Sequence, residues 1–193
     1  MLRTPLFESA NLRLTAVDPE QDAKIEAAWT YDLDYSQELI EMPARPLGPV
    51  ELKKLHEDGL KRVDERGNQY YFAIHLKDGN QLAGFVRFPF IFWMHSTAML
   101  RLGIADPSIL ARFGREALDM ALVYGFRELN LYRVETVLPA YRVEMIKLLE
   151  SAGFLMEVRR RQVFYRNGQY HDALHYGLLH EEWENQKSEE VVA

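Results

Sequence analysis

Three arginines near two predicted helix starts could hold an anionic ligand. Arg112 and Arg115 lie within one turn of each other, and Arg142 opens a second predicted helix. Guanidinium groups at these positions would bind phosphates through charge-assisted hydrogen bonds. Alternatively, Arg115 pairs with Asp119 one turn later and Arg142 pairs with nearby acids on a solvated face, which contributes little to stability. The sequence leaves both interpretations open.

Four side chains are candidates for proton transfer. His95 precedes a predicted strand, Glu38 and Glu41 lie in a proline-rich segment, and Tyr141 begins a predicted helix. A carboxylate or imidazole serves as a general base and a phenol as a general acid. Each of these residue types is also common in caps, in packing or at surfaces. The aromatic run from Phe90 to Trp93 fits a pocket lining, a core or a dimer surface, and we favour packing.

A metal site is not expected. His171 and His175 would share one face of a predicted strand and His180 the other, and no acids stand at ligand spacing beside them. Cysteine is absent, which excludes disulfides, thiolate metal sites and thiol nucleophiles. The sequence also has no phosphate-binding P-loop, zinc-protease helix, nucleophile elbow or dinucleotide-binding glycine pattern.

The charge balance disfavours nucleic acid as a partner. The formal net charge is -6, whereas binding to a nucleic-acid backbone requires clustered lysine and arginine. The basic run Arg159–Arg161 would alternate faces in a strand, with Arg160 opposite the other two. No window approaches the length of a membrane span, and the absence of cysteine fits a reducing compartment. We therefore expect a soluble, cytoplasmic protein.

The positions of these side chains depend on a mixed series of helices and strands. Helical periodicity appears at 19–31, 50–66, 110–125 and 139–152, and alternation predicts strands at 12–17, 70–76, 81–88, 96–104, 132–137, 156–166 and 169–179. Asn167-Gly168 between the last two runs is a strong signal for a tight hairpin, because both residues tolerate positive φ. Residues 31–49 contain three prolines and are predicted to form an irregular loop.

A length of 193 residues fits one domain. We place that domain at residues 1–183. Residues 184–193 are predicted to form a polar tail without fixed structure.

This element order resembles that of the GNAT acyl-CoA N-acyltransferases, in particular the branch that includes the ribosomal-protein N-terminal acetyltransferases. The resemblance covers Leu12 to Trp183. It is carried by short motifs in order: Leu82-Ala-Gly-Phe-Val86, Leu102-Gly-Ile-Ala-Asp-Pro107, Gly114-Arg-Glu-Ala-Leu118, Tyr124-Gly-Phe126, Leu129-Asn-Leu-Tyr-Arg-Val-Glu135, Leu148-Leu-Glu-Ser-Ala-Gly-Phe154 and Tyr176-Gly-Leu-Leu179. It implies an α/β fold with a mixed, mostly antiparallel seven-stranded sheet flanked by helices, and a V-shaped gap between strands 96–104 and 132–137.

The resemblance also implies acetyl-CoA as cosubstrate and transfer of an acetyl group to a primary amine. The acceptor would be a small molecule or a protein N-terminus. The implied cofactor contacts are the main chain of Ile104 and Ala105, the segment Arg112-Phe113-Gly114-Arg115 at a helix N-terminus, and Arg142. A homodimer is a further expectation.

Several positions depart from the family pattern. The pyrophosphate loop, R/Q-x-x-G-x-G/A in the family, reads Ile109 to Gly114 here and keeps only its last glycine. In the second helix, Arg142, Met145 and Leu149 replace the usual Asn, Ala and Tyr. The alternative function is therefore a non-catalytic GNAT-fold protein whose remodelled cleft binds another ligand or a partner protein.

Overall fold

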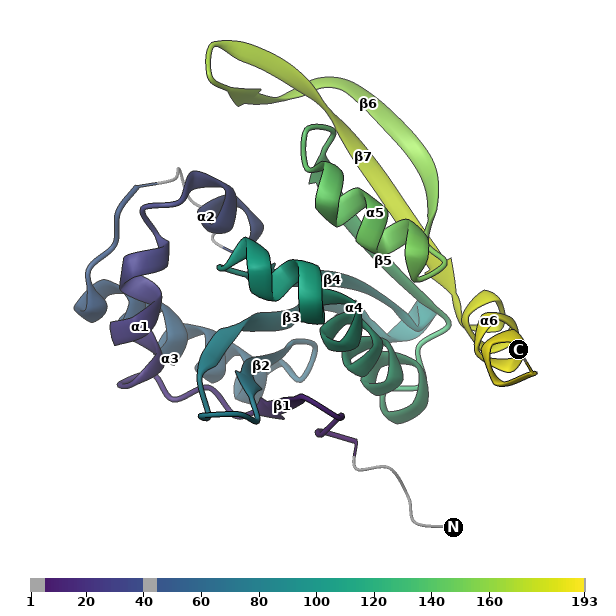
Figure 1. Ribbon diagram of the computed structural model, residues 1–193, viewed down its shortest axis with the longest axis horizontal. Helices are drawn as coiled ribbons and strands as arrows, with labels where there is room; N and C mark the ends of the chain where they lie inside the picture. The colour runs from purple at the N-terminus through teal and green to yellow at the C-terminus, as the bar shows by residue number, and fades with distance from the viewer. Residues whose placement is uncertain (1–5, 40–44, 193) are drawn as a thin grey trace.

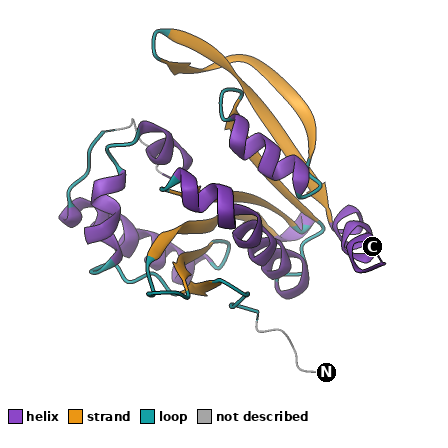
Figure 2. Cartoon of the chain, in the orientation of Figure 1, coloured by secondary structure: helices purple, strands orange, loops and turns teal. Residues whose placement is uncertain are grey.

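A seven-stranded mixed sheet forms the centre of the structure (Figures 1 and 2). The computed structural model describes residues 6–39 and 45–192, and for 37–39 and 189–192 it describes the backbone alone. The strands are ordered β1-β2-β3-β4-β5-β7-β6, with all neighbouring pairs antiparallel except β4–β5. Their bounds are β1 Leu12–Thr15, β2 Tyr70–Leu76, β3 Leu82–Phe92, β4 Thr97–Ile104, β5 Arg133–Pro139, β6 Leu155–Arg166 and β7 Gln169–Leu179. The predicted fold class is confirmed.

Helices cover both faces of this sheet (Figure 1). α1 (Asp22–Trp29), α2 (Leu33–Leu39) and α3 (Pro49–Arg66) pack on one face, and α4 (Pro107–Val123) and α5 (Val143–Ser151) on the other. A 3-10 turn, η1 (Trp93–His95), joins β3 to β4, a π-helical turn, η2 (Tyr124–Glu128), follows α4, and α6 (His180–Val192) follows β7. The apolar stripe predicted for α4 is buried against the sheet through Ala117, Leu118 and Ala121.

β4 and β5 diverge along their length, as the family resemblance implied. They pair in parallel only over Thr97–Arg133, Ala98–Val134 and Met99–Glu135. Beyond these pairs β4 continues to Ile104 beside β3, whereas β5 continues to Pro139 beside β7. The two strands therefore open a gap within the sheet.

The predicted hairpin around Asn167-Gly168 is confirmed. Asn167 has φ 50° and Gly168 φ 79°, and Arg166 pairs with Gln169 across the turn. The long β6–β7 hairpin extends beyond the rest of the sheet (Figure 1).

The predicted alternation of the basic run holds for Arg159 and Arg160, which pair with Leu174 and Ala173, but Arg161 lies in a β-bulge. A register shift separates Arg160 from Phe164, and Gln162 within it has φ 54°. Arg160 and Arg161 consequently line one surface hollow with Asp172, which also binds Arg159 at 2.6 Å. A β-bulge breaks the two-residue period on which the prediction relied.

Two segments expected to be irregular are helical. Within the predicted loop at 31–49, α2 begins after Asp32, whose carboxylate accepts a hydrogen bond from Asp34 N at 2.7 Å. The polar tail from 184 continues α6 to Val192. α6 is anchored by the buried indole of Trp183 and by Lys187, whose Nζ lies 3.3 Å from Asp119 Oδ1. Neighbouring elements thus stabilise helices that local composition alone did not predict.

Candidate active site

A cavity of about 130 Å³ lies in the gap between β4 and β5. Leu100, Arg101 and Leu102 line it from β4, and Thr136–Pro139 line it from β5. Leu118 of α4 and Asp34 of α2 also contribute to its wall, although these helices cover opposite faces of the sheet. The cavity therefore passes between the strands from one face to the other.

Charged groups line the cavity on the α2 side. Arg101 and Asp34 are part of its wall, together with the ring of Phe164 from β6. The Asp34 carboxylate lies 3.0 Å from Arg166 Nη2, a guanidinium group whose side chain is only 18% exposed. This ion pair joins the hairpin end to α2 and engages the one carboxylate that the described residues contribute to the cavity wall.

Apolar and aromatic side chains from the start of α5 close the other side. Met145 and Leu149, which replace the usual Ala and Tyr, are buried and line the cavity. Tyr141 also lines it, and its ring lies edge-on to His171 with the centroids 4.8 Å apart. Tyr141 is thus the one predicted proton-transfer candidate that the described residues place at the cavity.

Of the predicted cofactor contacts, Arg142 lines this cavity. Ile104 is buried at the end of β4, and Ala105 N donates a long 3.4 Å hydrogen bond to Ala83 O. Arg142 stands at the N-cap of α5 and lines the cavity. The structure therefore places Arg142 at the cavity, and Ile104 and Ala105 beside β3.

The segment that corresponds to the family's phosphate loop lies within α4, in agreement with the helix predicted from residue 110. The helix begins at Pro107, seven positions before Gly114, so the amides that follow its first turn are used within the helix. Asp106 caps the helix, since its carboxylate accepts hydrogen bonds from Ser108 N at 2.7 Å and Ser108 Oγ at 2.6 Å. These hydrogen bonds lower the pKa of Asp106, which keeps a negative charge at the helix N-terminus. The resemblance implied that Arg112-Phe113-Gly114-Arg115 lie at a helix N-terminus, whereas the structure places them inside α4.

The remaining residues of that segment have separate environments. Arg112 is exposed, with its guanidinium 4.8 Å from the ring centroid of the half-buried Phe113. Arg115 binds Asp119 at 3.1 Å, as the alternative interpretation of this arginine expected. Arg115 also donates a hydrogen bond to Ser151 O. A Cβ at Gly114 would lie 3.2 Å from Leu148 Cδ2, so this glycine allows α4 and α5 to pack closely.

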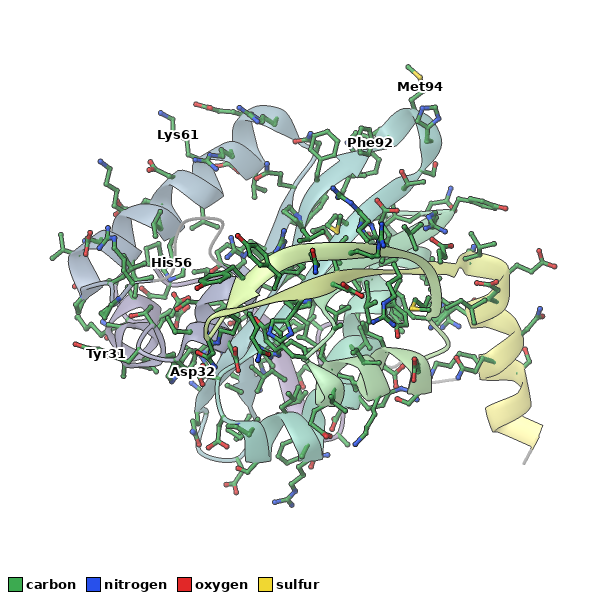
Figure 3. The ribbon with its side chains drawn as sticks, turned by 90° about the horizontal axis from the view of Figure 1, so that it is seen from above. Tyr31, Asp32, His56, Lys61, Phe92 and Met94 are labelled. Carbon is green, nitrogen blue, oxygen red and sulfur yellow. The ribbon has the colours of Figure 1, made fainter. Side chains whose placement is uncertain are left out.

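The other predicted proton-transfer residues lie elsewhere. His95 is exposed in η1, beyond the closed end of the β4–β5 gap. Glu38 belongs to α2, but its side chain lies outside the described residues, as does the whole of Glu41. Trp93 and Phe92, which we assigned to packing, are partly exposed, and Met94 stands at the tip of this turn (Figure 3).

A second cavity of about 390 Å³ lies between α3 and strands β2 and β3. Its floor is a buried polar chain in which Tyr35 donates to Glu26 at 2.9 Å and Glu26 lies 2.7 Å from His56 Nε2. His56 Nδ1 lies 3.0 Å from the Tyr71 hydroxyl. Burial raises the pKa of both Tyr35 and Tyr71, which keeps the phenols protonated. The chain links three helices to β2, and Figure 3 shows His56 on the inner side of α3 and Lys61 on its outer side.

Sequence reasoning missed Arg101, Asp34 and Arg166. One signal was available, because Arg101 interrupts the apolar run of a predicted inner strand. No such signal marked Asp34 or Arg166, since their pairing joins segments more than one hundred residues apart.

The described residues hold neither a cluster of metal ligands nor a membrane-spanning helix. Residues 6–39 and 45–192 contain no group of three or more His, Asp or Glu arranged to hold a metal ion. Within the same residues, no helix combines the length and apolar character that crossing a bilayer demands.

Comparison with known proteins finds that parts of the chain are similar in sequence to N-acetyltransferases. No profile of a known protein family matches it. An uncharacterized N-acetyltransferase of SPbeta prophage origin from Bacillus subtilis is 30% identical over 83 residues, which are 43% of this chain and 47% of the relative. The chain thus spans about half the length of this curated relative.

Solved structures match over most of the chain. Spermidine N-acetyltransferase from Vibrio cholerae, in complex with CoA and spermine, superposes with a TM-score of 0.77 at 22% identity and covers 92% of this chain and 100% of its own. The ribosomal L7/L12 alpha-N-protein acetyltransferase RimL, in complex with coenzyme A, gives a TM-score of 0.75 at 19% identity, with 89% and 95% covered. At these identities the likeness concerns the fold.

Proposed function

This chain is a GNAT-fold relative of the N-acetyltransferases, and from that premise we propose that it transfers an acetyl group from acetyl-CoA to a primary amine. The acceptor would be a small molecule or a protein N-terminus. The observation that carries the proposal is the cavity that passes through the sheet between β4 and β5. Two reactants can enter such a passage from opposite faces and meet within it, which converts the reaction into an effectively unimolecular one.

The cosubstrate fits this chain in part. The open edge of β4 beyond Met99 can receive an extended arm in the manner of an added strand, with Ile104 and Ala105 as main-chain partners. The capped start of α4 does not offer free amides for a pyrophosphate. Arginine side chains are the remaining donors, so Arg112, Arg115 and Arg142 would hold the phosphates around Phe113 and Gly114.

The chemistry requires little from the side chains. When bound, acetyl-CoA supplies an acetyl group activated as a thioester. Main-chain amides of β4 polarise its carbonyl, and the Tyr141 hydroxyl donates a proton to the departing sulfur. Glu38 and Glu41 are our candidates for accepting the amine proton. The attacking nitrogen gains the acetyl group as the carbon–sulfur bond breaks.

The direct test is calorimetric titration with acetyl-CoA, CoA and pantetheine, followed by measurement of thiol release with a panel of amines. We expect acetyl-CoA to bind with a dissociation constant on the order of micromolar, and thiol release to require an amine. If neither acetyl-CoA nor CoA binds at millimolar concentration, the proposed function is wrong.

A second function is favoured by one observation, the Asp106 carboxylate at the N-terminus of α4. A negative charge there repels phosphates, as would suit a non-catalytic protein whose cleft takes a different ligand. The same titration distinguishes the acetyltransferase from the non-catalytic protein, because the non-catalytic protein would bind CoA no more tightly than pantetheine.

We further propose a cytoplasmic homodimer formed through β6. This edge strand of 12 residues exposes Leu155, Met156 and Val158 to solvent, and exposed apolar edge strands tend to pair. Sedimentation should give a dimer mass, and Val158→Lys should shift the population toward monomer. A monomer at all concentrations would contradict this assembly.

A further inference from the structure

The end of the β6–β7 hairpin reaches the α2 side of the cavity. The β-bulge after Arg160 ends at Phe164, which lines the cavity together with Asp34 of α2. Two residues further along β6, Arg166 binds Asp34, with Nη2 3.0 Å from Oδ1. In Figure 3 the hairpin end lies beside Asp32, which precedes α2. The hairpin and α2 therefore meet across one wall of the cavity.

The ion pair between Asp34 and Arg166 is incompletely satisfied. The Arg166 side chain is 18% exposed, and its Nη1 is buried with no hydrogen-bond partner among the residues that the structure describes. Within the same residues, Asp34 Oδ1 is also buried and makes no aligned hydrogen bond. A guanidinium and a carboxylate ordinarily form two parallel hydrogen bonds, and a buried donor without a partner is unfavourable. A cation that bonds Asp34 in better alignment can therefore replace Arg166.

Asp34 is also the carboxylate that an entering amine would meet. It is the one carboxylate that the described residues contribute to the cavity wall. Arg101 and Arg142, the other charged groups that these residues place in the wall, each have an interaction of their own. Amines of the lysine or N-terminal type are mainly protonated at neutral pH, and a partly buried carboxylate attracts such a cation.

We propose that Arg166 is a placeholder for the acceptor: it occupies Asp34 while the site is empty, and the ammonium group of the acceptor takes its place. The inference rests on the proposed acetyl transfer and specifies how the acceptor of that reaction enters. The exchange keeps the Asp34 charge paired throughout, which avoids the cost of leaving a buried charge alone. It also releases the hairpin end from α2, so binding of the acceptor and opening of the hairpin are one event.

Two substitutions should change the KM for the acceptor in opposite directions. Asp34→Asn removes the carboxylate that binds the ammonium group and should raise this KM by about tenfold, because a hydrogen bond between charged groups is lost. Arg166→Gln removes the competing cation and should lower the same KM by about threefold or more, because the empty site is then already free to bind. Steady-state thiol release with the best amine of the panel measures both. A pair that only held the fold together would raise the KM in both variants.

The hairpin carries a matched control, which is a second pair of arginine and aspartate. Arg159 binds Asp172 at 2.6 Å, and Asp172 lines a surface hollow that is separate from the cavity. Arg159→Gln should leave the acceptor KM unchanged. The KM for acetyl-CoA should stay the same in all three variants, because we propose that the cosubstrate binds on the side of α4 and α5. Melting temperatures identify any variant that fails to fold.

A distance measurement follows the exchange without relying on turnover. The chain has no cysteine, so Tyr31→Cys before α2 and Gln169→Cys at the hairpin end can carry two spin labels at exposed positions. We expect one narrow label-to-label distance in the empty protein and a broader distribution after Arg166→Gln. Butylamine or alaninamide, which stand for a small-molecule amine and a protein N-terminus, should also broaden it. Sodium chloride at equal ionic strength should not, because salt screens buried pairs weakly.

The outcomes separate this inference from the proposed function. Opposite changes of the acceptor KM in Asp34→Asn and Arg166→Gln support both. An acceptor KM that rises in both variants, or changes in neither, would overturn the exchange while acetyl transfer stands. If no amine is turned over, broadening of the distance distribution by either amine supports the exchange alone. Equal effects of the amines and of sodium chloride would refute it.

Discussion

At the scale of single residues, we propose Tyr141 for proton transfer, because it lines the cavity between β4 and β5. The position where the family commonly has tyrosine is the buried, apolar Leu149, and Tyr141 lines the same cavity from the start of α5. Its ring contact with His171 fixes the phenol against β7. We propose that the role of the family tyrosine has moved from the last turn of α5 to Tyr141, two residues before the helix.

Removing the Tyr141 hydroxyl tests this assignment. We expect Tyr141→Phe to lower kcat by roughly a hundredfold while the KM values for both substrates change little, because the ring and its packing remain. Steady-state kinetics with thiol detection measures both constants. Tyr170→Phe, an exposed tyrosine on β7, is the control. An unchanged kcat in Tyr141→Phe would assign the residue to packing.

Arg112 is the second residue with a specific expectation. Because it is exposed and stacked on Phe113, its guanidinium can reach a phosphate without breaking an internal packing contact. We expect Arg112→Ala to weaken acetyl-CoA binding by about 1 to 3 kcal/mol, the usual cost of losing a hydrogen bond to a charged group. Pantetheine, which has no pyrophosphate, should bind equally to both proteins. Calorimetry measures the two ligands.

The effect of Arg112→Gly on stability and on CoA binding depends on whether this segment is a helix or a loop. Arg112 lies inside α4, where Arg112→Gly would cost about 1 kcal/mol of stability through lost helix propensity. It would not expose a backbone amide, because that amide lies in the helix interior. Tighter CoA binding by Arg112→Gly would therefore contradict the helical assignment of this segment.

At the scale of elements, the close approach of β3 and β4 positions the cavity wall. Gly84 is the register partner of Ile104, and a Cβ at Gly84 would overlap the carbonyl oxygen of Gly103 and lie 2.9 Å from Ile104 Cα. Backbone cannot move aside as a flexible side chain can. The proposed main-chain contacts at Ile104 and Ala105 thus depend on a glycine in the neighbouring strand.

Gly84→Ala should destabilise the protein by about 3 kcal/mol, because the sheet must shift to admit the methyl group. Gly59→Ala is the matched control in α3, where the nearest atom to the added Cβ is Tyr71 Cδ1 at 3.9 Å. This second change should stabilise the helix by up to about 1 kcal/mol. Urea unfolding measures both, and equal stabilities would show that the β3–β4 contact tolerates a side chain.

At the scale of the whole molecule, stability should depend on pH through His75. Burial lowers the pKa of His75 below 6.5, and its ring nitrogen lies 3.1 Å from Thr15 Oγ1 of β1. The unfolded chain therefore binds a proton more readily than the folded one as the pH falls below 6.5. The stabilising contribution is present above that pH and is lost as the pH falls through the folded-state pKa.

His75→Gln should flatten the stability curve between pH 6.5 and the folded-state pKa, because glutamine keeps a hydrogen-bonding group but does not titrate. Urea unfolding at a series of pH values measures the curve, and the pH 8 values serve as the reference at which the histidine is neutral. Burial raises the pKa of the nearby Asp22, which contributes the opposite slope in a more acidic window. If the stability curves of the unaltered protein and of His75→Gln are parallel, His75 is not the cause of the pH dependence.

Local sequence determined most of the fold. The two-residue alternation of the strands, the apolar stripe of α4 and the Asn167-Gly168 turn are decided by backbone preferences and by burial of one face. The resemblance to the GNAT family then implied the gap between β4 and β5 and a place for Arg142 beside it, and both Tyr141 and Arg142 line the cavity there.

Only the tertiary structure decided the character of the site. Asp34 and Arg166 meet because the hairpin end reaches α2, and Arg87 stands beside Arg101 because β3 and β4 pair in one register. Gly114 is fixed by the close packing of α4 against α5, because a Cβ there would lie 3.2 Å from Leu148 Cδ2. Contacts between distant segments set these features, and no local propensity encodes which distant residues will meet.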